Sequence, residues 1–298
     1  MVKNDKIGQI ILTVIMVLLV AFCVVPFLLL VMSSFTEESM LMQNGYSFFP
    51  EQFSLEAYGY ILKSGGKIIR GYGISIFVTV VGTAVSMLIT TLFAYPLSRR
   101  DLPFRKFISF FVFFTMLFNG GLIPSYMMWT QIFHIKNTLA ALIIPALLMN
   151  AFYIIMMRTY FTSSIPMELI ESVQIDGGSE WRILRNMIIP LSKPILATLG
   201  FMVALGYWND WTLGLYYITN TDLYGIQNIL NRILSDIQFL SSATSSGMGT
   251  DMSAVAASMP STAIRMAIAV VGVLPMLIIY PFFQKYLVKG ITIGAVKG

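Results

Sequence analysis

The stretch "ESVQIDGGSEWRILRNMIIPLSKP", residues 171–194, differs sharply in composition from the rest of the chain. It contains three acidic residues, three basic residues, a glycine pair and two prolines, and it lies between two of the most apolar runs of the sequence. The whole chain of 298 residues is 57% hydrophobic and only 11% charged. An apolar protein therefore contains a polar segment whose glycines and prolines are spaced as at the ends of two short helices.

The composition indicates a membrane protein. Roughly a quarter of the residues of a soluble domain are charged, and a mean hydropathy of +0.78 leaves too little polar surface to cover a soluble chain. The single Cys23 excludes an intrachain disulfide. The single His134 has no Cys or second His near it, so we expect no zinc site. The net charge of +5 is explained better by membrane topology than by nucleic-acid binding.

Six apolar segments approach the ~20 residues that a helix needs to cross the hydrocarbon core. We therefore predict an all-α polytopic membrane protein with six transmembrane helices. The first segment is too long for the core of a signal peptide and is followed by no convincing cleavage site, so we expect it to remain uncleaved. The second carries Gly82 and Ser86 at a spacing that suits close helix contact, and the third is interrupted by "NGGLIP". The segments are residues 10–32, 74–97, 107–131, 139–157, 195–218 and 264–284.

The distribution of lysine and arginine predicts the orientation. With both termini on the cytoplasmic side, 13 of the 19 basic residues fall on that side and 6 on the other. The opening stretch then belongs to a cytoplasmic loop between the fourth and fifth spans, whereas the loops at about 33–73 and 220–261 are external. We expect a multi-pass protein of the plasma membrane with both termini inside.

The cytoplasmic loop is patterned as two short helices. In the first, Leu169, Ile170 and Val173 are spaced to form an apolar face. Gly177 and Gly178 should end this helix, because glycine tolerates the left-handed conformation of a helix C-terminus.

The second helix follows the glycine pair. Ser179 can cap it, and Pro190 should stop it, because proline has no N–H to donate. A pair of amphipathic helices fits a brace in the lipid interface or a docking element for a soluble partner, and periodicity does not decide between them. The expected apolar stripe consists of Trp181, Leu184, Met187 and Ile188.

The glycine turn and the prolines after it resemble a known signature. "ESVQIDGG" followed by "IIPLSKP" is similar to the coupling-loop motif of ABC importer permeases, which reads E-A-A-x-x-D-G-A and then, about a dozen residues on, x-P-x-x-x-P. The matching positions are Glu171, Asp176, Gly177, Pro190 and Pro194. The motif's three alanines are replaced by Ser172, Val173 and Gly178.

The resemblance covers essentially the whole chain. "AYPLSRRDLPFRK" is similar to the junction of the second and third spans in the carbohydrate-uptake branch, and "QKYLVKGITIGAVKG" resembles the tail of the maltose-type second permease. "FNGGLIPSYMM" is similar to a subgroup associated with complex oligosaccharides. The implied fold is that of a type I importer permease. Residues 1–70 would form the first span and an external loop, 71–287 the transmembrane core with its coupling loop at 159–192, and 288–298 a cytoplasmic tail.

Such a permease is implied to work in a larger assembly. Its partners would be a second, homologous permease, two ATPase subunits and an extracytoplasmic solute-binding protein that delivers a sugar or oligosaccharide. ATP and Mg²⁺ would bind to the ATPases. This chain contains no G-x-x-x-x-G-K-[ST] motif, so we expect a transport subunit without a cofactor, a metal or an enzymatic activity of its own.

The same resemblance implies that the loop contacts an ATPase. Glu171 would pair with a basic residue in a cleft of the ATPase, although a solvated helix glutamate is the plainer alternative. Asp176 would hold the turn by accepting from local backbone N–H groups, and Glu180, off the motif, should matter little. The expected coupling residues are Glu171, Ser172, Val173, Asp176, Gly177, Gly178 and Pro190.

The sequence "GYWNDW" places polar groups in the fifth span. An intramembrane carboxylate is a functional candidate by default, and a tryptophan there could stack on a sugar. In the maltose-type pattern, however, the sugar is held mainly by the other permease. We therefore favour structural polar pairing or pathway lining over direct sugar binding for Asn209, Asp210, Trp208 and Trp211.

Two other functional classes compete with the ATP-driven importer. Secondary transporters, driven by an ion gradient, often have inverted repeats and acidic residues at broken helices. This chain has one interrupted span, one carboxylate within a span and no visible repeat. A membrane enzyme is less favoured still, because no Ser/His, Cys/His or multi-carboxylate cluster accompanies the spans. The ion-driven transporter is therefore the alternative interpretation.

Overall fold

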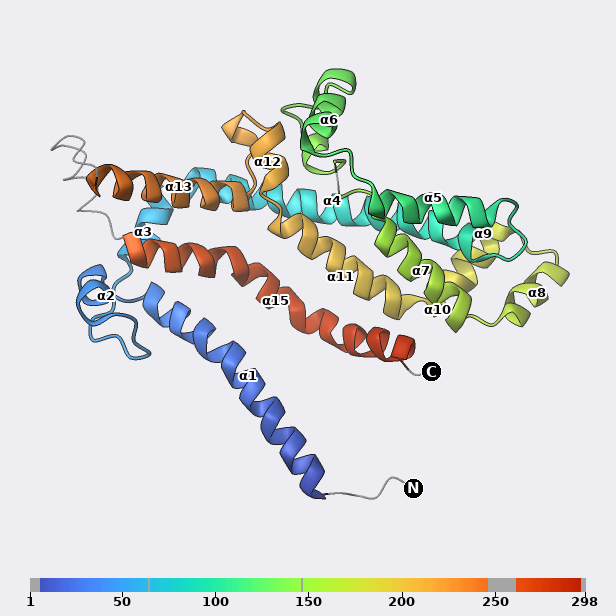
Figure 1. Cartoon of the computed structure of the whole chain (residues 1–298), viewed down its shortest axis with the longest axis horizontal. Coiled ribbons are helices and arrows are strands. Elements are labelled where there is room, and N and C mark those ends of the chain that lie inside the picture. The colour runs from blue at the N-terminus through green and yellow to red at the C-terminus, as the bar shows by residue number, and fades with distance from the viewer. Residues whose placement is uncertain (1–5, 64, 146, 246–260, 296–298) are drawn as a thin grey trace. The chain divides into compact units, whose positions relative to one another are not determined.

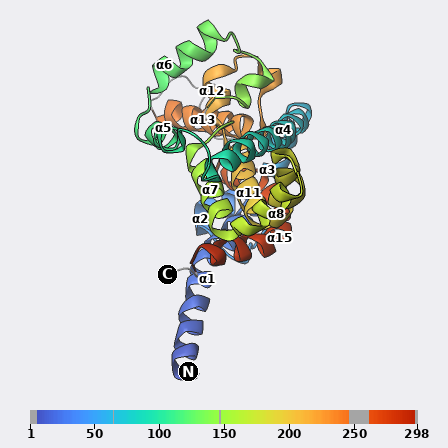
Figure 2. The ribbon, with the colours of Figure 1, turned by 90° about the vertical axis from the view of Figure 1, so that its right-hand side faces the viewer.

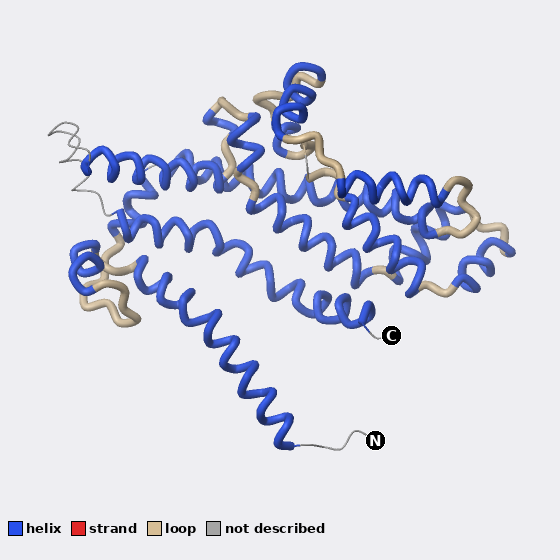
Figure 3. Tube along the Cα trace, viewed as in Figure 1, coloured by secondary structure: helices blue, strands red, loops and turns tan. Residues whose placement is uncertain are grey.

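Helices make up the regular structure of the chain (Figures 1 and 3). The computed structural model describes residues 6–63, 65–145, 147–245 and 261–295. Within those residues there is no strand beyond an isolated β-bridge between Thr36 and Phe53. The chain divides into two compact units, one made of residues 1–68 and 230–275 and the other of residues 69–229 and 276–298.

The first unit contains α1 (Lys6–Ser34), α2 (Glu38–Asn44) and α3 (Glu56–Lys63), with most of α13 (Ile226–Ser245) and the first part of α15 (Ser261–Ala295). The Ser34 hydroxyl lies 2.7 Å from the Tyr58 hydroxyl and joins the end of α1 to α3. The Glu38 carboxylate accepts from the backbone N–H groups of Thr262 at 2.9 Å and Ala263 at 2.8 Å. A distant side chain thus caps the start of α15, where an anion is favoured by the helix dipole.

Three helices are long and apolar enough to cross a membrane, and the described residues contain up to five such spans if two bent helix pairs are each counted as one. The three are α1, α4 (Gly65–Ser98) and α15. The bent pairs are Arg105–Leu117 with Leu122–Ile132, at 111°, and Glu180–Leu191 with Lys193–Asn209, at 80°. The all-helical prediction is confirmed, whereas the count of six spans is not.

The expected fourth span, residues 139–157, is not one helix. A 3-10 turn, η2 (Leu139–Leu142), is followed by irregular backbone, and α7 (Ala151–Ser164) begins only after Asn150. Pro145 lies between the two elements and cannot donate to a helix ladder. The Asn150 side chain accepts from the Phe152 N–H at 2.9 Å and so caps a new helix start. The break was not predicted from the sequence, because mean hydropathy over an apolar segment does not detect a helix cap.

The core of the second unit forms around the last turns of α4. It includes α5 (Arg105–Leu117), α7, α8 (Met167–Ile175) and α11 (Lys193–Asn209). Figure 2, which looks along the long axis of Figure 1, shows α4, α7, α8 and α11 grouped together. The largest fully buried side chains of this core are Ile154, Met157, Ile183, Ile188 and Leu199.

Close approach of α4 and α11 depends on a glycine. A Cβ on Gly82 would lie 2.5 Å from Cζ of Tyr207, so the phenol ring occupies the space that any side chain would need. The expectation that Gly82 permits close helix contact is confirmed. The Tyr207 hydroxyl donates to the Ile143 carbonyl at 2.9 Å, which satisfies the backbone of the irregular segment.

Several short elements complete the second unit, and Figure 1 shows two of them, α6 and α12, near the middle of α4 and away from α8. The short elements are α6 (Leu122–Met127), the π-helical turn η1 (Met128–Ile132), α12 (Thr212–Tyr217) and η4 (Thr221–Leu223). Tyr126 stacks on Tyr217 with ring centroids 5.6 Å apart. The Asn137 side chain accepts from the backbone N–H groups of Thr219 at 2.6 Å and Asn220 at 3.0 Å, which ties η1 and α12 together.

Candidate coupling site and polar residues of the fifth span

The first helix of the predicted coupling loop is α8. Ile170 is buried and Val173 packs against the core, as its apolar periodicity predicts. Leu169, however, is 42% exposed. The buried face is therefore narrower than expected, because a helix of nine residues can bury only one stripe against a single neighbour.

The helix ends in a Schellman motif. Gly177 has φ +73°, and its N–H donates to the Gln174 carbonyl at 3.0 Å. The Gly178 N–H donates to the Val173 carbonyl at 2.8 Å. The predicted glycine stop is confirmed. The Asp176 side chain, expected to hold the turn, makes no hydrogen bond to any described residue, because the backbone already closes the turn.

Val173 and Gly178 are sterically matched across this turn. A Cβ on Gly178 would lie 2.5 Å from Val173 Cγ1 and 2.8 Å from the Val173 carbonyl oxygen. In the motif that the sequence resembles, both positions are alanine. Here Val173 is larger than alanine by two methyl groups and Gly178 lacks the Cβ, so the increase in volume at position 173 is offset by the decrease at position 178.

The second helix consists of α9 (Glu180–Ile183), a π-helical turn η3 (Leu184–Ile188) and α10 (Ile189–Leu191). The Ser179 hydroxyl accepts from the Arg182 N–H at 3.4 Å, so the predicted cap is confirmed. The predicted stripe is wrong at one position: Trp181 is 60% exposed, and Ile183 is fully buried in its place. Leu184 and Ile188 are buried as expected.

Pro190 does not stop this helix. The widened turn of η3, in which the Ile189 N–H donates to the Leu184 carbonyl, precedes it directly. A wider turn spreads the carbonyls against which a proline ring would otherwise clash. The chain bends instead at Ser192, which is fully buried.

The tip of the loop presents an exposed surface, defined here as the coupling surface. It consists of Glu171, Ser172, Ile175, Asp176, Gly177 and Trp181, all of them exposed. Ile175 is 86% exposed. The Glu171 carboxylate has no hydrogen-bond or ion-pair partner in the described part of the chain. The coupling surface thus combines two carboxylates with two large exposed apolar side chains, those of Ile175 and Trp181.

Sequence reasoning missed a polar cluster between the loop and α4, consisting of Tyr95, Arg99, Asp101, Gln174 and Glu180. The Tyr95 hydroxyl donates to Oε2 of Glu180. Oε1 of Glu180 accepts from the Gln174 amide at 3.0 Å and lies 3.4 Å from Nη2 of Arg99. The prediction that Glu180 matters little took no account of these contacts, because two of its three partners, Tyr95 and Arg99, are more than 80 positions away and leave no local signal in the sequence.

Arg99 carries a charge that is almost fully buried. Its side chain is 7% exposed and forms a bidentate pair with Asp101, at 3.1 Å from Nε and 3.2 Å from Nη2. This hydrogen bonding lowers the pKa of the Asp101 carboxyl. Two carboxylates therefore compensate one guanidinium, which makes its burial tolerable.

Two further arginines hold the same end of α4. Nε of Arg105 donates to the Leu97 carbonyl at 3.0 Å, and Nε of Arg158 donates to the same oxygen at 3.2 Å. Carbonyl groups in the last turn of a helix have no partner within the helix, and cations there complement its dipole. The end of α4 is thus fixed to α5 and to α7.

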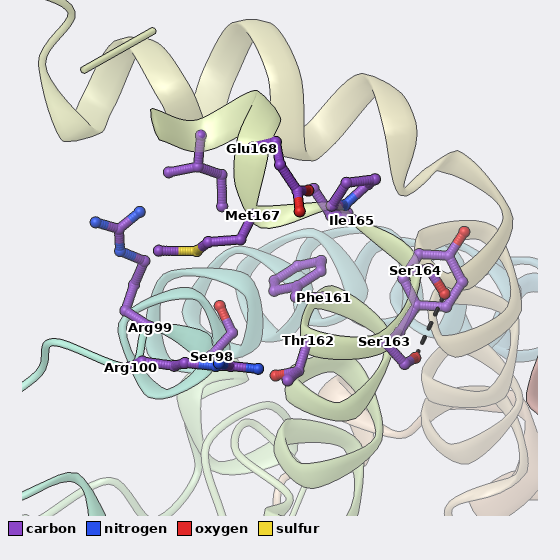
Figure 4. A pocket seen from close by; sticks show the side chains of 13 residues that line it. Ser98, Arg99, Arg100, Phe161, Thr162, Ser163, Ser164, Ile165, Met167 and Glu168 are labelled. Atoms are coloured by element: carbon purple, nitrogen blue, oxygen red, sulfur yellow. Dashed lines mark hydrogen bonds between the residues drawn. The ribbon is translucent and has the colours of Figure 1, made fainter. Parts of the chain in front are cut away.

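A cleft of about 660 Å³ lies beside this cluster, between the end of α4, the end of α7 and the start of α8 (Figure 4). The residues that line it include Ser98, Arg99, Arg100, Phe161 and Glu168. No group of three or more His, Cys, Asp or Glu side chains in the described residues could hold a metal ion.

The polar residues of the fifth span are placed by a helix break. α11 ends at Asn209, and the Asp210 carboxylate accepts from the Thr212 hydroxyl at 2.6 Å and from the Leu213 N–H at 3.1 Å. These are the bonds of a cap on α12. Trp208 is buried, with its ring 6.1 Å from that of Tyr72 on α4, whereas Trp211 is 42% exposed.

Comparison with known protein families places most of the chain in one group. Residues 74–293 match the family described as "Binding-protein-dependent transport system inner membrane component". Protein LplC of Bacillus subtilis (strain 168) is 38% identical over 278 residues, which cover 93% of this chain and 90% of that protein. The polygalacturonan/rhamnogalacturonan transport system permease protein YtcP of the same organism is also 38% identical over 278 residues, with 93% of each chain covered.

A solved structure has the same fold. It is the crystal structure of a bacterial ABC transporter involved in the import of the acidic polysaccharide alginate. One of its chains is similar with a TM-score of 0.79 and 26% identity, over 96% of this chain and 99% of that chain. The chain therefore has the type I ABC permease fold.

Proposed function

This chain belongs to the family of inner membrane components of binding-protein-dependent transport systems, and from that premise we propose that it carries a complex oligosaccharide across the plasma membrane, driven by partner ATPases. The sequence-based assignment to the sugar-importing ABC permeases is confirmed. The chain is a transport component and not an enzyme. The ion-driven alternative finds no support among these relatives.

The single observation that carries the coupling role is the coupling surface. Glu171 is exposed beside a turn that two backbone hydrogen bonds close, and its carboxylate has no hydrogen-bond or ion-pair partner among the described residues. A charged, exposed loop tip with apolar side chains beside it suits insertion into a cleft of a soluble partner. We assign α8, the glycine turn and α9 as the coupling helix pair that meets the ATPase.

The proposed topology follows from the basic residues. Both termini and the coupling surface would face the cytoplasm, in keeping with the bias of 13 to 6. Six crossings would result if α7 serves as the fourth span despite its late start at Ala151. The boundaries at residues 70/71 and 287/288 remain proposals. α15 itself continues through residue 288 to Ala295.

The substrate class is proposed from the relatives. YtcP is named for polygalacturonan/rhamnogalacturonan transport. Another relative, AraQ of Halalkalibacterium halodurans, is named for arabinooligosaccharides and is 26% identical over 300 residues. The solved transporter is described as importing the acidic polysaccharide alginate, so all three names refer to oligosaccharides or polysaccharides. An oligosaccharide rather than a monosaccharide is therefore the proposed cargo.

The proposed partners are a second homologous permease, two ATPase subunits and a solute-binding protein, with ATP and Mg²⁺ bound only on the ATPases. Co-expression of the four components, with a tag on this chain alone, should recover the ATPases in detergent. In proteoliposomes, uptake of pectic or arabinan oligosaccharides should require both ATP and the binding protein. Uptake by this chain alone under a proton or sodium gradient would overturn the proposal.

A further inference from the structure

The end of α4, which is far away in sequence, and the nearby helix α8 meet at the Glu180 carboxylate. One oxygen accepts from the Tyr95 hydroxyl in the last turn of α4, and the other is shared by Gln174 of α8 and Arg99 just after α4. Glu180 itself is the first residue of α9. A single side chain thus joins both helices of the coupling loop to α4.

The α4 side of this junction is buried and held from several directions. Tyr95 is 6% exposed and Arg99 is also 6% exposed. Arg105 and Arg158 both donate to the Leu97 carbonyl between them. If Glu180 is displaced, α4 must move with it, together with α5 and α7. Otherwise the hydrogen bonds to the charged Glu180 carboxylate must break.

α4 runs from this junction to the region of the broken fifth span. Gly82 on α4 contacts the Tyr207 ring, and Tyr72, two turns and more further on, lies beside the Trp208 ring. Both aromatic residues belong to the last turn of α11, next to the Asp210 break. α4 is thus bound to Glu180 at one end, and toward its other end it lies beside Trp208, a candidate pathway residue.

We propose that Glu180 is a positioning residue that transmits movement of the coupling loop to α4, separately from the surface that binds the ATPase. The inference rests on the proposed function, because it assumes that an ATPase moves the loop. Two roles are thereby assigned to neighbouring parts of one loop. Glu171 binds the ATPase, and Glu180 transmits the displacement of the loop to α4.

The test measures coupling apart from binding in the assembled transporter. Glu180→Ala removes both acceptor oxygens, whereas Glu180→Gln keeps one acceptor oxygen and an amide that can bond the Tyr95 hydroxyl. Tyr95→Phe removes one donor with little change of volume. The matched controls are Glu168→Ala, an exposed glutamate on α8, and Arg100→Ala, an exposed arginine beside Arg99.

Each variant is compared for membrane-inserted amount, ATPase recovery, ATP hydrolysis and oligosaccharide imported per ATP hydrolysed. Hydrogen bonds to charged groups shift an equilibrium by roughly tenfold to a hundredfold. Glu180→Ala should therefore lower the import per ATP by about tenfold or more while ATPase recovery stays at the wild-type level. Tyr95→Phe should produce part of that loss, Glu180→Gln should restore most of the coupling, and both controls should match wild type.

Different results identify which assumption fails. Wild-type import per ATP in both Glu180→Ala and Tyr95→Phe would overturn the transmitting role, and Tyr95→Phe decides the matter if Glu180→Ala fails to insert. Loss of ATPase recovery in Glu180→Ala would also overturn it, since the residue would then shape the binding surface. Failure of the wild-type chain to recover ATPases would instead refute the proposed function.

Discussion

In the glycine turn between α8 and α9, Gly177→Ala and Gly178→Ala should destabilise the loop for two different physical reasons. Gly177 has φ +73°, and a Cβ there would meet no atom within 4 Å. Gly177→Ala should therefore cost only the left-handed backbone, about 1–2 kcal/mol. In Gly178→Ala the new Cβ would lie 2.5 Å from Val173 Cγ1, and overpacking of this kind costs about 1–3 kcal/mol.

Val173→Ala distinguishes the backbone strain of Gly177→Ala from the overpacking of Gly178→Ala. It removes Cγ1 and so should recover part of the loss in Gly178→Ala. Recovery should be incomplete, because the Val173 carbonyl oxygen would still lie 2.8 Å from the new Cβ. It should recover nothing in Gly177→Ala, whose cost has no steric partner. In a double-mutant cycle we expect a coupling of about 0.5–3 kcal/mol between positions 173 and 178, and close to zero between 173 and 177.

Limited trypsin cleavage at the exposed Arg182 and Arg185 provides the assay. A helical bond must open locally before it is cut, so the cleavage rate reports the free energy of opening when opening and closing are fast. One to two kcal/mol should raise the rate by roughly 5–30-fold. Equal rescue of both glycine variants by Val173→Ala, or rescue of neither, would refute the steric account.

Three further results are expected. Asp210→Ala should destabilise α12 by about 0.5–2 kcal/mol through loss of its cap, whereas Asp210→Asn should retain uptake; loss of uptake in Asp210→Asn would indicate direct contact of the carboxylate with cargo. Hydrogen bonding from Arg99 lowers the pKa of Asp101 in the folded protein. The stability that this pair contributes should therefore be complete above the ordinary carboxyl pKa of 3.8 and be lost as the pH falls below that value. In thermal unfolding of the complex, Asp101→Asn should reduce the loss of stability at acid pH. In a background without the native cysteine, an impermeant thiol reagent applied to intact cells should label Ser245→Cys and not Ser179→Cys, and the reverse pattern would overturn the proposed orientation.

Local features of the coupling loop were predictable because their physics is local. The positive φ of Gly177 and the capping hydroxyl of Ser179 depend on residues within one turn, and both are confirmed. The resemblance to ABC importer permeases rests on the order of Glu171, Asp176, Gly177 and the two prolines, which is itself a sequence property, and the family match over residues 74–293 confirms it.

Features that depend on distant residues were not predictable. Glu180 looked neutral because Tyr95 and Arg99 are brought to it only by folding. Trp181 was placed inward and Ile183 overlooked, since a four-residue helix followed by a π-turn does not keep the rotation of a regular helix. The break within residues 139–157 was missed because an apolar run can hold a proline and an Asn cap without changing its hydropathy.

The most direct test of the central claim is the affinity of the assembled permease for its ATPases in Glu171→Ala, measured beside Glu168→Ala. Truncating one partner of a buried charge pair costs about 2–5 kcal/mol, whereas an exposed pair contributes at most about 1 kcal/mol. We expect Glu171→Ala to weaken ATPase binding by the larger amount and to abolish uptake, while Glu168→Ala binds like wild type and both variants insert normally. ATPase binding and uptake at wild-type levels in Glu171→Ala would contradict the account, and the helix pair would then be a brace at the membrane surface.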